Sequence, residues 1–138
     1  MIDNDCIFCK IIRGDIPCAK IYETPSVLAF LDIAPIRPGH ALVIPKAHHP
    51  DLWDLPDEAG RDLLAAFKTV GRAVVQATGT GGCNLVMNNG APAGQLVEHA
   101  HFHLIPRETG DGLHLWPGGS YDDAQAMSRM AEAIRSRI

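Results

Sequence analysis

The sequence lacks the features by which a protein holds a long nucleic acid or crosses a membrane. Its formal net charge of −4 provides no positive field for a polyphosphate backbone, so we expect no nucleic acid polymer as a partner. Apolar runs such as VLAFL and ALVI are too short to span a bilayer, and the acidic start MIDNDC has no basic leader. We therefore expect a cytoplasmic protein that does not bind membranes.

Cysteine is also scarce, with four residues in a chain of 138. A chain near this length buries about two thirds of its unfolded surface, so one hydrophobic core can hold it without disulfides. Cys18 and Cys83 are most simply interpreted as packed free thiols. We find no internal repeat or linker, and we predict a single domain over 1–138.

Hydrophobic spacing predicts an α+β domain. The pattern of residues 7–13 predicts a short helical turn, and the pattern of residues 57–78 predicts a long amphipathic helix with Pro56 near its first position. Ser120 is expected to cap a C-terminal helix after an irregular, glycine-rich extension. Short connections favour a mainly antiparallel sheet of five strands, at about 19–23, 27–33, 40–45, 84–88 and 97–105.

Three histidines at alternate positions, His99, His101 and His103 in the run HAHFHLIP, are the most informative feature of the sequence. Side chains alternate across a strand, so the three rings share one face while the intervening apolar residues take the other. Burying an imidazole costs free energy unless its nitrogens find partners. A chemical role explains such a row better than packing does.

The pair Cys6-x-x-Cys9 can present two thiolates to one tetrahedral ion, with His48 and His99 as candidates for the remaining ligands. Two buried thiols or a redox pair are the alternatives. A catalytic zinc held by the histidine row itself is less favoured, because the end rings of the row lie about 13 Å apart along a strand. At most two rings of the row are expected to meet on a single metal.

The link NNGAPAGQ, residues 88–95, runs directly into the histidine row. Glycine permits close approach of the backbone, and successive N–H groups can hold a phosphate, although a glycine-rich hairpin without a ligand shows the same pattern. Asp32 ends the run VLAFLD and is either a turn residue or an acceptor for the hydroxyls of a ribose.

The run HAHFHLI resembles the signature of the histidine triad (HIT) family, in which three histidines alternate with hydrophobic residues. The resemblance extends through CIFCKIIRGDIP, VLAFLDIAPIRPGHALVIPK and NNGAPAGQ, over roughly residues 6–107. It is strongest with the zinc-containing bacterial members that hydrolyse nucleoside phosphoramidates. The resemblance implies a single-domain HIT fold with a five-stranded, mainly antiparallel sheet, a long helix and a C-terminal helix, and it implies a homodimer.

The resemblance also implies roles for individual residues. His101 would be the nucleophile that takes the nucleotidyl group, and His103 would donate to the phosphate. A structural Zn²⁺ would be held by Cys6, Cys9, His48 and His99. A small purine nucleotide would be bound by Phe8, Ile11, Phe30, Asp32, Ile33, Asn88, Gly94, Gln95 and Val97. Some relatives place a hydroxyl residue between Gln95 and Val97, whereas this chain has Leu96, so only main-chain donors remain at that position.

The expected reaction passes through a covalent nucleotidyl-histidine, which requires a neutral ring with one nitrogen tied down. A nearby main-chain carbonyl on the same strand is the expected partner of that nitrogen in His101. Two alternatives remain open on the sequence. One is a hydrolase that uses zinc-activated water, and the other is a nucleotide-binding module whose catalysis is vestigial.

Overall fold

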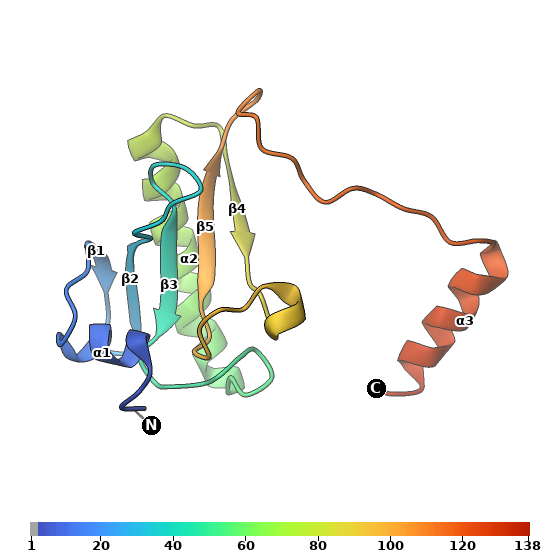
Figure 1. Cartoon of the computed structure of the whole chain (residues 1–138), viewed down its shortest axis with the longest axis horizontal. Coiled ribbons are helices and arrows are strands. Elements are labelled where there is room, and N and C mark those ends of the chain that lie inside the picture. Colours follow the sequence, from blue (N-terminus) through green and yellow to red (C-terminus); the bar gives the residue numbers. More distant parts are fainter. Residues whose placement is uncertain (1–2) are drawn as a thin grey trace.

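A five-stranded antiparallel sheet with the strand order β1-β2-β3-β5-β4 organises the chain (Figure 1). The computed structural model describes residues 3–138. In chain order the elements are α1 (Ile7–Arg13), β1 (Lys20–Glu23), β2 (Val27–Leu31), β3 (Ala41–Pro45), α2 (Asp57–Thr78), β4 (Gly82–Val86), the 3₁₀ turn η1 (Ala91–Ala93), β5 (Phe102–Arg107) and α3 (Ala124–Arg135). The predicted α+β class is confirmed.

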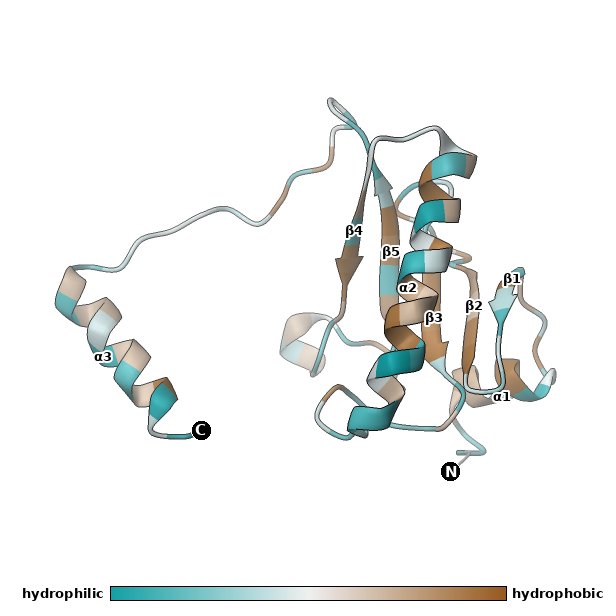
Figure 2. Cartoon of the chain, turned by 180° about the vertical axis from the view of Figure 1, so that it is seen from behind, coloured by the Kyte–Doolittle hydropathy of each residue, from teal (hydrophilic) through white to brown (hydrophobic). Residues whose placement is uncertain are grey.

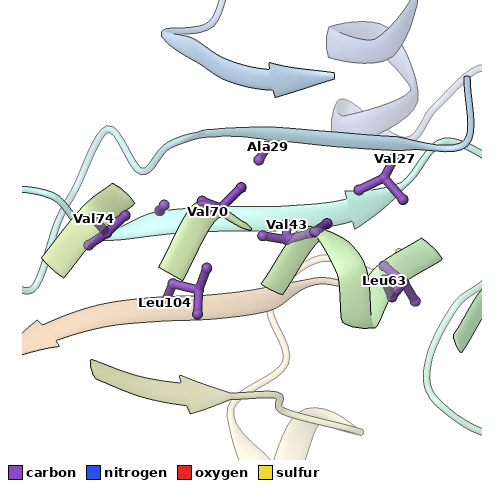
Figure 3. Close-up of a cluster of buried hydrophobic side chains, with 9 residues drawn as sticks. Val27, Ala29, Val43, Leu63, Val70, Val74 and Leu104 are labelled. Atoms are coloured by element: carbon purple, nitrogen blue, oxygen red, sulfur yellow. The ribbon is translucent and has the colours of Figure 1, made fainter. Parts of the chain in front are cut away.

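The helix α2 covers one face of the sheet because its apolar residues recur every three or four positions. Leu63, Val70 and Val74 point from this helix into a cluster that also contains Val43 and Leu104 (Figure 3). Burial of one such side chain contributes roughly 1.5–3 kcal/mol to stability. This cluster is the main core, and it fixes the strands on which the histidines lie.

The opposite face of the sheet carries a second, smaller core beneath α1. Phe8 of α1 packs there with residues of β2 and β3, namely Leu28, Phe30, Leu42 and Ile44. Alternate residues of β2 thus face the two cores, and this double burial explains why VLAFL is apolar throughout instead of alternating. The N-terminal turn is therefore anchored to the central strands.

The predicted strand 97–105 is wrong at its start, because β5 begins only at Phe102. The preceding backbone is diverted from the ladder: the N–H of Ala100 donates to the carbonyl of His49 at 2.6 Å, and the carbonyl of His99 accepts from a side chain. Only His103 of the histidine row lies within the strand. The other two rings are held on extended chain just before it.

Four further boundaries differ from the prediction. The helix α3 is capped by Asp123, whose carboxylate accepts from the N–H of Ala126, and not by Ser120. Pro56 is the N-cap of α2, just outside the helix. The strand β4 spans Gly82–Val86, so it begins and ends two residues earlier than the predicted 84–88. The strand β2 ends at Leu31, two residues before the predicted end at position 33.

The C-terminal extension leads away from the sheet to α3, which stands apart from the rest of the chain (Figures 1 and 2). Within residues 3–138, no side chain of α3 is buried, although Met127, Met130 and Ile134 form an apolar stripe with about half of each exposed. Among the described residues, no helix combines the length and the apolar character needed to cross a membrane.

Candidate active site and metal centre

The ring of His101 is fixed by its own backbone. Its Nδ1 lies 2.6 Å from the carbonyl oxygen of His99, and because a carbonyl only accepts, Nδ1 carries the proton. The predicted main-chain partner is thereby confirmed. The edge of Phe8 packs against the same ring with 5.2 Å between centroids, and His101 is only 6% exposed. The remaining nitrogen, Nε2, keeps a free lone pair, as a nucleophile requires.

His103 is oriented by a second histidine, His40, which lies just before β3. The Nε2 of His40 is 2.8 Å from the Nδ1 of His103, and the N–H of Ile36 donates to the Nδ1 of His40 at 3.0 Å. Since Nδ1 of His40 accepts, its Nε2 carries the proton and donates to His103. The Nδ1 of His103 is therefore an acceptor, and the Nε2 of His103 carries a proton that is available to a ligand.

Both of these histidines are held in the neutral form. Burial lowers the pKa of His103 to about 4, and the neighbouring rings of His101 and His40 lower it further. Burial also lowers the pKa of His40, opposed by the carboxylate of Asp32. The chain of hydrogen bonds from Ile36 to His103 is thus built from neutral groups near pH 7.

Asp32 lies at the end of β2, beside His40. One of its carboxylate oxygens accepts the N–H of Ala34 at 2.8 Å, and the other is 3.7 Å from the Nε2 of His40. The ligand atoms of Asp32, His40 and His103 lie within 4.8 Å of one another, a spacing that suits a metal ion. However, the protonated Nε2 of His40 has no lone pair to offer, so the hydrogen-bonded chain explains this group better.

The link 88–95 approaches the histidines as a turn around η1, with Gly94 in the left-handed region at φ +92°. The side-chain amide of Asn88 lies 3.5 Å from the carbonyl of Gly94. Gln95 fixes the link from both ends: its oxygen accepts the N–H of Gly90 at 2.8 Å, and its nitrogen donates to the carbonyls of Pro50 and Val97. Its amide therefore holds the shape of the link.

The residues expected to surround a base differ in exposure. Phe8 and Phe30 are buried in an edge-to-face pair, and Ile11 and Val97 pack partly against the same core. Ile33, by contrast, is 99% exposed. Because Phe8 and Phe30 are themselves buried, a base in this region would contact mainly the partly exposed Ile11 and Val97 and the exposed Ile33.

An open cleft of about 1030 Å³ borders the histidines on the side of β4. His103 lines it at one end, Asn88 and Ala93 contribute from the link, and Leu113 and Trp116 come from the start of the C-terminal extension. His103 thus borders a space large enough for a nucleotide-sized ligand.

The second constellation joins Cys6, Cys9, His48 and His99, as the sequence predicted. The Nδ1 atoms of His48 and His99 are 3.2 Å apart, Cys6 Sγ is 3.4 Å from His99 Nδ1, and Cys9 Sγ is 3.5 Å from His48 Nδ1 and 3.7 Å from His99 Nδ1. Tetrahedral zinc with Zn–N near 2.0–2.1 Å and Zn–S near 2.3 Å requires ligand separations of about 3.3–3.8 Å. The four donors therefore fit a closed Cys₂His₂ site.

Local hydrogen bonds orient these candidate ligands, while burial raises the pKa of the Cys6 thiol, so that a bound cation would be needed to hold it as a thiolate. Cys6 is the N-cap of α1, and its sulfur accepts the N–H of Cys9, whose own sulfur accepts the N–H of Asp3 at 3.4 Å. The Nε2 of His99 lies 2.8 Å from the carbonyl of Pro45, which leaves Nδ1 unprotonated and aimed at the sulfurs. Burial lowers the pKa of His99 to about 4, so the ring is neutral.

The sequence interpretation missed His40 and the loop that orients it. His40 follows a Pro-Gly turn and precedes a strand whose partner carries His103, with Leu42 opposite His103 in the register. A histidine at the head of a strand next to the histidine strand was the available signal. The N–H of Ile36 could not have been found, because its role depends on the conformation of the loop.

Comparison with known proteins places these features in context. A family model described as the HIT domain matches residues 13–110. Adenosine 5′-monophosphoramidase hnt1 of Schizosaccharomyces pombe is 47% identical over 137 residues, which cover 96% of this chain and 98% of that protein. Adenylylsulfatase HINT3 of Arabidopsis thaliana is 46% identical over 81% of this chain, but the chain spans only 57% of the length of that relative.

A solved structure bears on the cysteine–histidine cluster. The crystal structure of a zinc-bound histidine triad family protein from Mycobacterium smegmatis superposes on this chain with a TM-score of 0.76 at 36% identity, over 94% of this chain and 97% of that one. The similarity extends well beyond the histidine row.

Proposed function

Because the chain belongs to the HIT domain family, we propose that it hydrolyses nucleotides with a displaceable group on the α-phosphate, above all nucleoside phosphoramidates, through a nucleotidyl-histidine on His101. The names of the two relatives, a monophosphoramidase and an adenylylsulfatase, support this substrate class. The observation that carries the proposal is the ring of His101, whose Nδ1–H is bound to the carbonyl of His99 while Nε2 remains free.

In the first step, Nε2 of His101 forms a bond to the α-phosphorus and the bond from phosphorus to the leaving group breaks. The departing amine takes a proton from solvent, and the imidazole becomes cationic. The hydrogen bond of 2.6 Å from Nδ1 to the carbonyl of His99 then becomes charge-assisted and strengthens. In the second step, water attacks the phosphorus, the N–P bond breaks, and the nucleoside monophosphate leaves.

Negative charge develops on the phosphoryl oxygens in both steps, and donors fixed in advance lower the barrier. His103 supplies one, since the bond from His40 leaves its Nε2–H directed at a ligand. The side-chain amide of Asn88 would supply another, beside the turn that Gln95 holds in shape. The N–H groups of Ala93, Gly94 and Gln95 donate instead to carbonyls within that turn, so the expected main-chain donors are occupied in this structure.

A purine nucleoside would be held on the opposite side of the phosphate. The free oxygen of Asp32 is placed to accept ribose hydroxyls, because its other oxygen is occupied by the N–H of Ala34. The base would lie toward the group formed by Phe8, Ile11, Phe30, Ile33 and Val97.

We further propose that Cys6, Cys9, His48 and His99 hold a structural Zn²⁺. The ligand separations and the zinc-bound relative from Mycobacterium smegmatis support this assignment. Four protein ligands leave no open position, so the ion would contribute stability by tying α1 to the chain before β5, and no chemistry. The same closure argues against a hydrolase that uses zinc-activated water.

The protein is proposed to act as a homodimer. The strand β4 forms one edge of the sheet, its Leu85 is half exposed, and the apolar stripe of α3 covers nothing within the described chain. A second copy would cover such surfaces. Light scattering at micromolar concentration would give twice the 14.9 kDa mass of the chain, whereas a monomeric mass at every concentration would contradict this.

Steady-state hydrolysis of adenosine phosphoramidate tests the proposed activity. The His101→Ala variant should lose turnover on the order of 10³-fold or more, while a matched His49→Gln variant should retain it. Equal turnover in the two variants would overturn the nucleophile. Binding of nucleoside monophosphate by the unaltered chain without any turnover would instead favour the nucleotide-binding module.

A further inference from the structure

The loop 32–40, between β2 and β3, determines how His40 sits, because its main-chain hydrogen bonds converge on that residue. Asp32 N–H donates to the carbonyl of His40, and the N–H of His40 donates to the carbonyl of Arg37, each at 3.0 Å. The N–H of Ile36 reaches the ring of His40. The position of Ile36 therefore sets the tautomer of His40.

Little apolar packing holds this loop against the rest of the chain. Ile33 is 99% exposed and Ile36 is 54% exposed. Gly39 provides a close contact, since a Cβ there would lie 2.5 Å from the methyl group of Thr78, and its φ of +95° also favours glycine. The middle of the loop, around Ile36, needs another attachment.

Arg37 provides that attachment through two carboxylates at the root of the C-terminal extension. Its Nη1 donates to Asp111 at 2.9 Å and its Nη2 to Glu108 at 2.7 Å. The carboxylate of Asp111 is only 3% exposed, so this ion pair is shielded from solvent. The shielded contact to Asp111, supported by a more exposed one to Glu108, restricts the guanidinium more than a single exposed pair would.

Asp111 is a fixed anchor because it has other partners. Arg107 donates to it through Nε at 2.7 Å and Nη2 at 3.1 Å, and the N–H of Leu113 donates at 3.0 Å. Removal of Arg37 would therefore leave Asp111 paired. The loss would fall on the loop and not on the fold of the extension.

We propose that Arg37 is a positioning residue, which holds Ile36 against His40 and thereby fixes His103 as the tautomer that carries its proton on Nε2. The expected effect of Arg37 on kcat rests on the proposed function, whereas its expected effect on the tautomer of His103 does not. Without the ion pairs of Arg37 with Asp111 and Glu108, the loop shifts and His40 adopts either tautomer. Part of the His103 population then presents a lone pair, not a proton, to the phosphoryl oxygens.

Loss of one directing hydrogen bond, at about 1 kcal/mol, corresponds to about a fivefold change in an equilibrium. Because only the competent fraction of His103 falls, we expect Arg37→Met to lower kcat measurably but by no more than about fivefold, with KM within twofold. The control is Arg13→Met, which removes the ion pair of another partly exposed arginine, that of Arg13 with Asp15, outside the loop and away from Asp111. Arg37→Lys, which keeps a charge near Asp111, should recover part of kcat.

The decisive readout is the ¹⁵N NMR spectrum of the imidazoles in the metal-loaded, full-length chain. The unaltered chain and Arg13→Met should show His103 as one tautomer, protonated at Nε2, while Arg37→Met should show a mixture. A single unchanged tautomer in Arg37→Met, or an equal mixture in both variants, would overturn the inference.

Two further outcomes are distinguishable. Should Arg37→Met not fold, Glu108→Gln removes one of the two contacts at a half-exposed residue, and a smaller shift toward the mixture is expected. If Glu108→Gln showed no shift toward a mixture of tautomers, the positioning role of Arg37 would be contradicted. Should the unaltered chain show no turnover, the proposed function fails, whereas the NMR comparison still decides the role of Arg37.

Discussion

The Nε2 of His40 lies 2.8 Å from the Nδ1 of His103, and this contact joins a loop residue to the histidine row. Since His40 is the donor, it determines which nitrogen of His103 carries the proton. The account therefore depends on a histidine outside the row as well as on the three within it.

Replacement of His40 by leucine should lower kcat on adenosine phosphoramidate by about tenfold to hundredfold, because His103 loses the donor that keeps its proton on Nε2. His40→Gln retains an N–H donor and should lose less. Comparing the steady-state rates of the two variants checks this. Equal losses would mean that His40 acts only by filling space, since leucine and glutamine differ little in volume.

The stability of the protein should fall in mild acid, partly because of His103. Its pKa in the folded state is about 4, against an ordinary value of 6.5, so the unfolded chain binds a proton more readily between these values. The contribution of His103 is fully present above about pH 6.5 and is lost as the pH falls toward about 4.

Urea unfolding at pH 7 and pH 5 measures this contribution when the unaltered chain is compared with His103→Gln. The variant should lose less free energy of unfolding between the two pH values. Protonation of the cysteine–histidine cluster affects both proteins equally. A variant with the same loss as its parent would show that His103 titrates normally.

Removal of the proposed zinc should lower the melting temperature before it lowers turnover of the molecules that remain folded, because the ligands join α1 to the chain before β5. Chelation followed by calorimetry and by rates per folded molecule checks this order. Cys18→Ser is the matched control for Cys9→Ser, since Cys18 lies outside the cluster. A rate that depended strictly on metal at an unchanged melting temperature would contradict a structural role.

Leu96→Ser tests the expectation that a hydroxyl residue between Gln95 and Val97 assists the leaving group. Leu96 is 93% exposed, so its replacement should alter stability by less than about 0.5 kcal/mol. The added hydroxyl would give the leaving group a donor, and we expect kcat on phosphoramidates to rise. Rates with amine and fluoride leaving groups, measured side by side, show whether the gain is specific to amines. A lower kcat for amines would exclude this role.

Much of the fold followed from local patterns. Gly79 ends α2 in the left-handed region where the sequence placed the end of the helix, and the apolar spacing of Leu63, Val70 and Val74 predicted the face that is buried. The start of β5 could not be predicted, because alternation describes extended chain equally well whether or not it pairs. The bond from Ala100 to His49, which removes that segment from the ladder, is a tertiary contact.

The residues of the candidate site likewise fall into some that the sequence could predict and some that it could not. The pair Cys6 and Cys9 could be connected with His48 and His99 because each donor has a recognisable chemistry. The role of Arg37 could not, since arginine is common on surfaces and its carboxylate partners lie more than 70 residues away. Contacts that depend on where a loop ends are beyond the reach of spacing alone.

The most direct test of the account is intact-mass analysis of the chain quenched during turnover of adenosine phosphoramidate, followed by peptide mapping. The account predicts an added adenylyl group on the peptide that contains His101, absent from His101→Ala. Rapid turnover with no adduct at any quench time, or an adduct that persists in His101→Ala, would contradict it.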